Sequence, residues 1–511
     1  MRKRWIIFAS LLIMSLLVSA CSGSSQKGEK GEEGKSEIKE MSVRINSDPD
    51  FLDPHKAEAS LTFRMMLNVF EGLFNPSPDG SVEPAIAEKY QVSDDGLVYT
   101  FTLRDEVKFH NGDPVTVKDV KYSFDRLMGT GTGQPLSSDF VNVEAVETPD
   151  DKTVVMKLKK PDSTFIYRLT AEQAAIIPES NDANQNTKPI GTGSFKFVEY
   201  NPENNLIIEK NKDYWKKDVP YLDKVTFVFQ SDNQSALLSL QGGQLDLTDI
   251  PAHQKAEVEK NFTIIEQENN SVFLLGFNNE KKPFSDLKVR QAINYAINKD
   301  EIIEGAFSGY ATKLGSNLSP IMGKYYKKGL EDYYPANVEK AKQLLAEAGY
   351  PDGFKTTLTI SSHAELYSDA AQIAVEQLKK VGITAEIKVV EWAKWLEDVY
   401  GKRDYEMTMI DFTGKLDPYK ILSRYVSTNK SSNLMNFNNA EFDKLMADVV
   451  LETDEAKQIA MYQQAQEILT KQAAAVFIAD YKTLWGMNPK VEGFKSYPIF
   501  YMDMAHMKPK Q

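Results

Sequence analysis

The sequence predicts a mixed α/β protein with two or three lobes. Of the 511 residues, about 470 follow residue 40, which is too many for a single hydrophobic core. Strand-like stretches with alternating side chains are frequent, and in the second half they alternate with helical stretches. We therefore expect one lobe with a mixed or antiparallel sheet and a second lobe of the α/β type.

Eight strands are expected from the alternation of apolar and polar side chains. They are 99–103, 153–158, 194–198, 224–229, 272–277, 356–360, 383–390 and 405–410.

The helices are expected from their caps and mostly lie in the second half. Ser285 or Asp286 can cap one helix, and Asn337 can cap another that stops at Gly349. A third helix stops at Gly382, and a long fourth one covers 454–472.

The first residues predict export. Basic residues at 2–4 precede an uncharged stretch at 5–18, and small residues lead to Cys21. This order is typical of a secretory signal, and the apolar stretch is too short to span a bilayer. We expect residues 1–20 to be a signal peptide.

The segment 18–21, Val-Ser-Ala-Cys, resembles a bacterial lipobox, in which the signal is cut before the cysteine and the thiol carries a diacylglycerol. The polar stretch that follows, rich in Gly, Ser, Lys and Glu, cannot bury enough surface to fold. We therefore expect lipidation at Cys21, a flexible tether at 21–40, and membrane contact through the lipid alone. Cys21 is the chain's one cysteine, so the mature domain would have no disulfide.

No motif of an enzyme is found. The chain has no His-Glu-x-x-His, no Gly-x-Ser-x-Gly and no phosphate-binding loop, and its five histidines are scattered without metal-ligand spacing. We expect no catalytic residue, no metal site and no cofactor. The net charge of −13 disfavours nucleic acid as a partner.

Several long motifs follow one another along the chain. They are 52–55, 97–104, 107–112, 119–123, 189–195, 211–215, 277–279, 283–284, 289–293, 341–349 and 381–383. Together they resemble the family 5 extracellular solute-binding proteins, the oligopeptide, dipeptide and nickel class of ABC importers. The resemblance covers residues 42–508.

This resemblance implies a two-lobed periplasmic-binding-protein fold of type II, with an extra inserted subdomain as in cluster C and a hinge of two crossing segments. The implied parts are lobe I (41–56, 188–268 and 485–511), the inserted subdomain (57–187) and lobe II (269–484). It also implies a monomer on the cell surface or in the periplasm. Its partners would be a peptide or small solute and the permease and ATPase subunits of the importer.

The resemblance also implies ligand-binding residues. In the family, a loop after the early Asp-Pro-His segment runs along the peptide backbone, and it corresponds here to Glu58, Ala59 and Ser60. Their backbone groups could pair with an extended ligand as an added strand does. The family's cleft aromatics correspond to Trp392 and Phe412.

The sequence departs from the family where charged ligand groups are recognised. Peptide-binding members place an aspartate after the second aromatic to pair the ligand's ammonium, and the stretch after Thr413 has Gly414 or Lys415 there. Asp411 or Asp417 is a candidate substitute, and a lysine could favour an anionic group instead.

The arginine with which dipeptide-binding members hold the ligand carboxylate is also missing, and His363 is the candidate replacement. These departures disfavour a standard dipeptide and favour a longer peptide. Two alternatives stay open: a nickel metallophore or another small solute, and a lipoprotein with hydrolase or chaperone activity.

Overall fold

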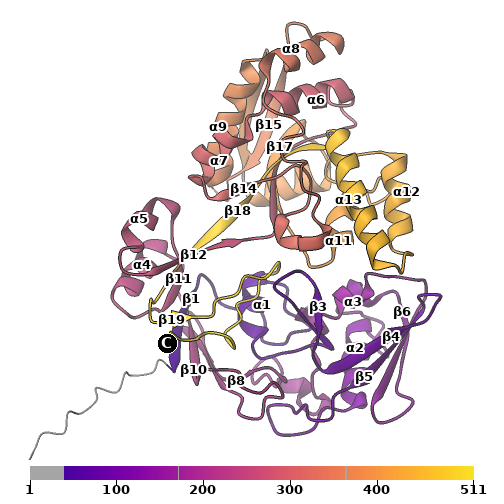
Figure 1. The fold of residues 1–511 in the computed structure, drawn as a ribbon, viewed down its shortest axis with the longest axis vertical. Helices are drawn as coiled ribbons and strands as arrows, with labels where there is room; N and C mark the ends of the chain where they lie inside the picture. Colours follow the sequence, from indigo (N-terminus) through magenta and orange to yellow (C-terminus); the bar gives the residue numbers. More distant parts are fainter. Residues whose placement is uncertain (1–38, 171, 363–364, 511) are drawn as a thin grey trace, which may run out of the picture. The chain divides into compact units, whose positions relative to one another are not determined.

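The structure, a computed structural model, describes residues 39–170, 172–362 and 365–510 (Figure 1). The signal peptide, the lipidation at Cys21 and the role of His363 concern positions outside the described residues.

One group of elements comes from residues 40–66 and 195–268 and from the C-terminal tail. β1 pairs in parallel with β10 and β11, and β10 continues through antiparallel β9 to β8. The elements of this group are β1 (Glu40–Ile45), α1 (Ser60–Met66), β8 (Phe195–Asn201), β9 (Asn205–Lys210), β10 (Lys224–Phe229), α4 (Asn233–Gln241), β11 (Leu247–Asp249), α5 (Lys255–Val258), β12 (Thr263–Glu268), β19 (Val491–Glu492) and β20 (Lys508–Pro509).

A four-stranded antiparallel sheet, in the order β4-β5-β7-β6, forms between α1 and β8 in the chain. Helix α2 packs on it and begins with a capping box between Thr116 and Asp119. The elements are β2 (Phe74–Pro76), β3 (Val82–Pro84), β4 (Ala87–Val92), β5 (Val98–Leu103), α2 (Val117–Met128), η1 (Ser138–Phe140), β6 (Val143–Glu147), β7 (Thr153–Leu158), α3 (Phe165–Arg168), η2 (Glu172–Ala174) and η3 (Glu179–Asn184).

The second half contains an α/β arrangement in which β15 is parallel to both β16 and β17. The strands are β13 (Ser271–Phe277), β14 (Ala311–Lys313), β15 (Phe354–Ser361), β16 (Ile383–Val390), β17 (Met407–Thr413) and β18 (Ala475–Met487). The helices are α6 (Leu287–Ala296), α7 (Lys299–Phe307), α8 (Val338–Glu347), α9 (Glu365–Lys379), α10 (Trp392–Trp395), α11 (Pro418–Leu422), α12 (Ala440–Val449) and α13 (Glu455–Lys471).

Strand β18 joins these arrangements. Its first half pairs with β13 and β14, and its second half pairs with β11 and β12, as its long yellow arrow in Figure 1 shows. The chain crosses a second time between β12 and β13, at Asn269 and Asn270. Strands β1 and β8–β18 therefore form one 12-stranded hydrogen-bonded sheet, and β2–β7, β19 and β20 lie outside it.

Buried side chains form separate hydrophobic cores. One core contains residues between 272 and 479, a second contains residues of the first sheet and of the C-terminal tail, and a third contains residues 73–176. Among the described residues, no helix is long and apolar enough to cross a membrane.

Most expected elements are found, with three differences. The strand expected at 405–410 is β17, Met407–Thr413, because pairing with β13 continues through Thr413. The elements that were not expected include helices α1, α2, α4, α7 and α12 and strands β1, β4, β6, β9, β12 and β18; the capping box of α2 was a signal for it. Strands β1 and β8–β12, expected in one lobe, share one sheet through β18 with β13–β17, expected in the other.

Candidate functional site

A cavity of about 390 Å³ lies between segments that are far apart in the sequence. It is lined by Glu58, Ser60, Phe63, Leu136, Ser137, Ser138, Asp139, Tyr167, Arg168, Thr170, Glu172, Gln173, Thr413, Gly414, Lys415, Leu416, Asp417, Lys420, Ile499 and Phe500. The cavity thus brings together six of the residues implied by the family resemblance: Glu58, Ser60, Thr413, Gly414, Lys415 and Asp417.

The first wall is the loop before α1, and Asp50 holds this loop in place. Its Oδ2 accepts hydrogen bonds from the backbone N–H groups of Glu58 (2.7 Å) and Ala59 (3.0 Å). Its Oδ1 accepts one from Thr62 Oγ1 (2.6 Å). Burial raises the pKa of Asp50, but these hydrogen bonds together lower it more. The pKa of this carboxyl therefore lies below its usual value.

The two amides expected to pair with an extended ligand are therefore already bonded within the protein. The loop offers the side chains of Glu58 and Ser60 to the cavity, and Ala59 is not among the lining residues.

The second wall follows β17. The carboxyl ends of β15, β16 and β17 lie at the same edge of the sheet, where open α/β sheets bind ligands. Asp417, 3 % exposed, caps α11 through Oδ1, which accepts a hydrogen bond from the Tyr419 N–H (2.8 Å). Its Oδ2 is buried and has no hydrogen-bond partner among the described residues. Burial raises the pKa of Asp417 to about 6, although Arg168 and Lys420 lower it.

The third wall comes from residues 136–139, 167–170 and 172–173, which no motif indicated. Lys420 Nζ forms an ion pair with Asp139 (2.5 Å), which links the third wall to the second. Arg168 pairs with Asp162 (2.6 Å). Burial raises the pKa of Glu172, which forms no ion pair among the described residues.

The remaining implied residues lie beside the cavity rather than in its lining. Asp411 accepts hydrogen bonds from the hydroxyls of Ser271 (3.0 Å), Tyr481 (3.4 Å) and Tyr367. The Arg424 guanidinium lies 4.8 Å from the centre of the Phe412 ring.

Trp392 is 39 % exposed and stacks on Trp395, with ring centres 5.3 Å apart. A ligand-binding role for Trp392 and Phe412 stays a prediction.

The crossing between β12 and β13 contacts two walls. Asn270 Nδ2 donates to the carbonyls of Pro498 (2.8 Å) and Lys415 (3.3 Å), and the backbone carbonyl of Asn270 accepts from the Gly414 N–H (2.5 Å). Gly414 permits this approach, because a Cβ there would overlap Asn270. Neither Asn270 nor the tail at 498–500 carries a motif that sequence reasoning could have used.

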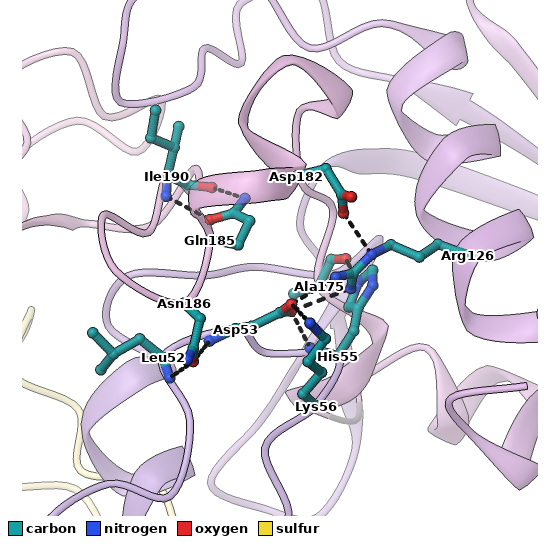
Figure 2. Close-up of polar contacts among 10 residues, drawn as sticks. All are labelled: Leu52, Asp53, His55, Lys56, Arg126, Ala175, Asp182, Gln185, Asn186 and Ile190. Carbon is teal, nitrogen blue, oxygen red and sulfur yellow. Dashed lines mark hydrogen bonds and ion pairs between the residues drawn. The ribbon is translucent and has the colours of Figure 1, made fainter.

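A second buried polar cluster precedes the loop (Figure 2). Arg126 Nη2 pairs with Asp53 (2.6 Å), and its Nε pairs with Asp182 (2.8 Å). His55 Nε2 lies 2.8 Å from the carbonyl of Ala175, and burial lowers the pKa of His55 to about 4, so the ring is neutral at pH 7. This cluster fixes the chain that leads into Glu58.

The sequence matches a known family over most of its length. Residues 81–433 match the profile of the bacterial extracellular solute-binding proteins, family 5, middle part. The glutathione-binding protein GsiB of Pectobacterium atrosepticum is 32% identical over 479 residues, which cover 90% of this chain and 92% of that protein. Heme-binding protein A of Haemophilus influenzae is 32% identical over 458 residues, which cover 82% of this chain and 83% of that protein.

A solved structure shows the same fold. The ABC transporter-associated periplasmic binding protein DppA of Helicobacter pylori, in complex with the peptide STSA, superposes with a TM-score of 0.74. It is 27% identical, and the match covers 92% of this chain and 98% of that one. The architecture is therefore that of a type II periplasmic binding protein.

Proposed function

Since the chain belongs to the family 5 bacterial extracellular solute-binding proteins, we propose that it captures a short peptide and delivers it to the permease of an ABC importer. The observation that carries this proposal is the cavity, in which a buried carboxylate oxygen of Asp417 has no hydrogen-bond partner among the described residues. A buried carboxylate without a partner is costly, and a ligand ammonium would remove that cost.

The size of the cavity supports a short ligand. Sites for small molecules usually enclose about 300 to 1,000 Å³, and 390 Å³ lies near the lower end of that range. A peptide of a few residues fits this volume better than a long oligopeptide does. Glutathione is the first ligand to test, because a relative that shares 32% of its residues is a glutathione-binding protein.

Asp417 is the best candidate for the ammonium. Both oxygens of Asp411 already accept hydroxyl hydrogen bonds, and the backbone N–H of Gly414 is bonded to Asn270. Lys415 is exposed at the cavity and has no such bond from its amine among the described residues, so it is available to an anionic group of the ligand.

Ligand capture would favour a closed arrangement. We assign lobe I to 41–56, 188–268 and 485–511, the inserted subdomain to 57–187 and lobe II to 269–484. A ligand that touches Phe500 of lobe I and Asp417 of lobe II together contacts both lobes at once, so it shifts the population toward the closed state. The crossings at Asn270 and in β18 would serve as the hinge.

The same proposal places the protein outside the cell. Residues 1–20 would be removed, Cys21 would carry the lipid, and 21–40 would tether the binding domain near the permease and ATPase subunits. A monomer suffices, since one chain supplies every wall of the cavity.

Mass spectrometry of small molecules released from the purified protein tests this function directly. We expect short peptides, and calorimetry with glutathione and with other tripeptides should give saturable binding of one ligand per chain. Release of heme or of a nickel chelate instead, with no binding of any short peptide, would contradict the proposal.

A further inference from the structure

Arg64 differs from every other arginine in the described part of the chain. No hydrogen bond or ion pair is formed by its guanidinium with any described residue, although each of the other described arginines forms at least one. Those bonded arginines are Arg44, Arg104, Arg126, Arg168, Arg290, Arg403 and Arg424.

The surroundings of Arg64 are aromatic. Its guanidinium carbon lies 5.4 Å from the centre of the Trp485 ring and 5.4 Å from that of Phe500. Burial lowers the pKa of Arg64, and Asp249 offsets this only in part. The two rings fix the plane of the cation but do not supply an oxygen to its five N–H donors.

Arg64 borders a second, smaller cavity beside the first. This cavity is lined by Arg64, Gln267, Asn269, Trp485, Phe494, Tyr497, Ile499, Phe500, Tyr501 and Met502, and it shares Ile499 and Phe500 with the main cavity. Its lining contains no Asp or Glu, so the charge of Arg64 is not balanced there.

The polar neighbours in the small cavity are already engaged. Gln267 Oε1 accepts from Trp485 Nε1 (2.7 Å), and Asn269 bonds to Tyr481 and Thr483 of β18. The hydroxyl of Tyr497 donates to Asp503 (2.7 Å). Arg64 is thus the charged group of this lining that still has donors to offer, beside the neutral Gln267 Nε2 and the Tyr501 hydroxyl.

We infer that Arg64 is an anion subsite, which binds a terminal carboxylate of the ligand through N–H···O bonds to the one carboxylate oxygen that enters the small cavity. A guanidinium matches a carboxylate in geometry, and such bonds are strong where water is excluded. The small cavity has a volume of about 10 Å³, room for about one water-sized group, so it admits the tip of a ligand and not a side chain. The inference rests on the proposed function and narrows the ligand to a peptide with a free carboxylate at one end.

The experiment compares a ligand with and without that carboxylate. Binding of glutathione and of glutathione ethyl ester, in which the glycine carboxylate is blocked, is measured by calorimetry for the wild type and for Arg64→Gln, Arg64→Lys and Arg104→Gln. Arg104 is the matched control, because it too stacks on a tryptophan (4.4 Å from Trp215) but donates to the Ala85 carbonyl. Trialanine and its amide form a second pair of probes.

We expect the wild type and Arg104→Gln to bind each free acid at least about tenfold more tightly than its blocked form. Arg64→Gln should bind both forms about equally, and Arg64→Lys should recover part of the preference. The ligand-free Arg64→Gln protein should melt no lower than the wild type, which separates a binding role from a structural one. An unchanged preference in Arg64→Gln would overturn the inference.

If the wild type binds no peptide, the proposed function is contradicted, and a separate experiment then tests the anion subsite alone. Sodium acetate is then compared with sodium chloride at equal ionic strength in a thermal melt. A carboxylate-specific rise in melting temperature that Arg64→Gln abolishes supports the subsite. Equal responses of the two proteins contradict it.

Discussion

The cluster around Asp53 and the cavity beside α1 are both buried and charged, but they differ in how their charges are paired. In the cluster, the carboxylates of Asp53 and Asp182 meet Arg126, and His55 is held neutral (Figure 2). In and beside the cavity, the buried Oδ2 of Asp417 and the half-buried guanidinium of Arg64 have no hydrogen-bond partner among the described residues.

The difference separates stability from binding. A buried charge that is fully paired inside the protein can hold segments together, since removing either partner leaves the other uncompensated. A buried charge left without a partner lowers stability, and it persists where a ligand supplies the missing partner. We therefore expect changes in the cluster to affect folding and changes in the cavity to affect affinity.

The largest effect is expected from Arg126→Ala. The variant leaves buried Asp53 with only its longer, 3.6 Å ion pair to the exposed Lys56, so the free energy of unfolding should fall by about 3 kcal/mol. Urea unfolding followed by circular dichroism measures it, and the affinity of the folded fraction should stay near that of the wild type. A loss of stability well below this value would show that the cluster contributes little to the stability of the fold.

Asp417→Asn should instead weaken ligand binding without lowering the stability of the fold. Asparagine keeps the helix cap, but it cannot pair an ammonium as a carboxylate does. We expect the affinity for a peptide to fall by roughly 2 to 5 kcal/mol. The Kd from calorimetry measures this change, and an unchanged Kd would remove Asp417 from the site.

The difference in stability between the wild type and Asp417→Asn should depend on pH in a defined direction. The pKa of Asp417 is raised from 3.8 to about 6 on folding, so the folded state binds more protons between these values and its stability falls as pH rises through them. The ionised group costs the ligand-free protein roughly 3 kcal/mol above that window and nothing below it. The variant should therefore be more stable than the wild type near pH 8 and equal to it near pH 3; equal stability at both pH values would contradict the assigned pKa.

Gly414→Ala tests the contact between the crossing segment and the cavity wall. The new Cβ would overlap Asn270, so we expect about 1 to 3 kcal/mol of strain and a weaker affinity. Asn270→Ala in the same background should relieve part of the strain. Two independent, additive effects in this double-mutant cycle would argue against the contact.

Lys415→Ala should give the smallest effect. The side chain is exposed, so its attraction for an anionic ligand is screened by solvent and salt. We expect a change in binding free energy below about 1 kcal/mol that disappears at high ionic strength. A large change that persists in salt would mean that Lys415 is buried against the ligand.

Local signals were sufficient for most of the fold. Asn337 and Gly349 delimit α8, and the alternation at 383–390 gives β16 with the same ends. The site was predictable only where the family order could be followed, as for Glu58 and Asp417. The pairing of the loop amides with Asp50 is invisible in the sequence, because nothing local distinguishes them from free amides.

Arg64 and Phe500 could not have been linked from the sequence either. They are more than 400 positions apart, and no periodic pattern records that the C-terminal tail returns to α1. Three-dimensional packing alone brings them together, and so the anion subsite emerges from the structure.

Proton release on ligand binding tests the central claim that the cavity keeps Asp417 unpaired for a ligand. Calorimetry near pH 6 in two buffers of different ionisation enthalpy counts the protons released. The account predicts that the wild type releases about half a proton per ligand, because the ammonium ionises the half-protonated Asp417, and that Asp417→Asn releases none. Equal release by both proteins, or none by the wild type, would contradict it.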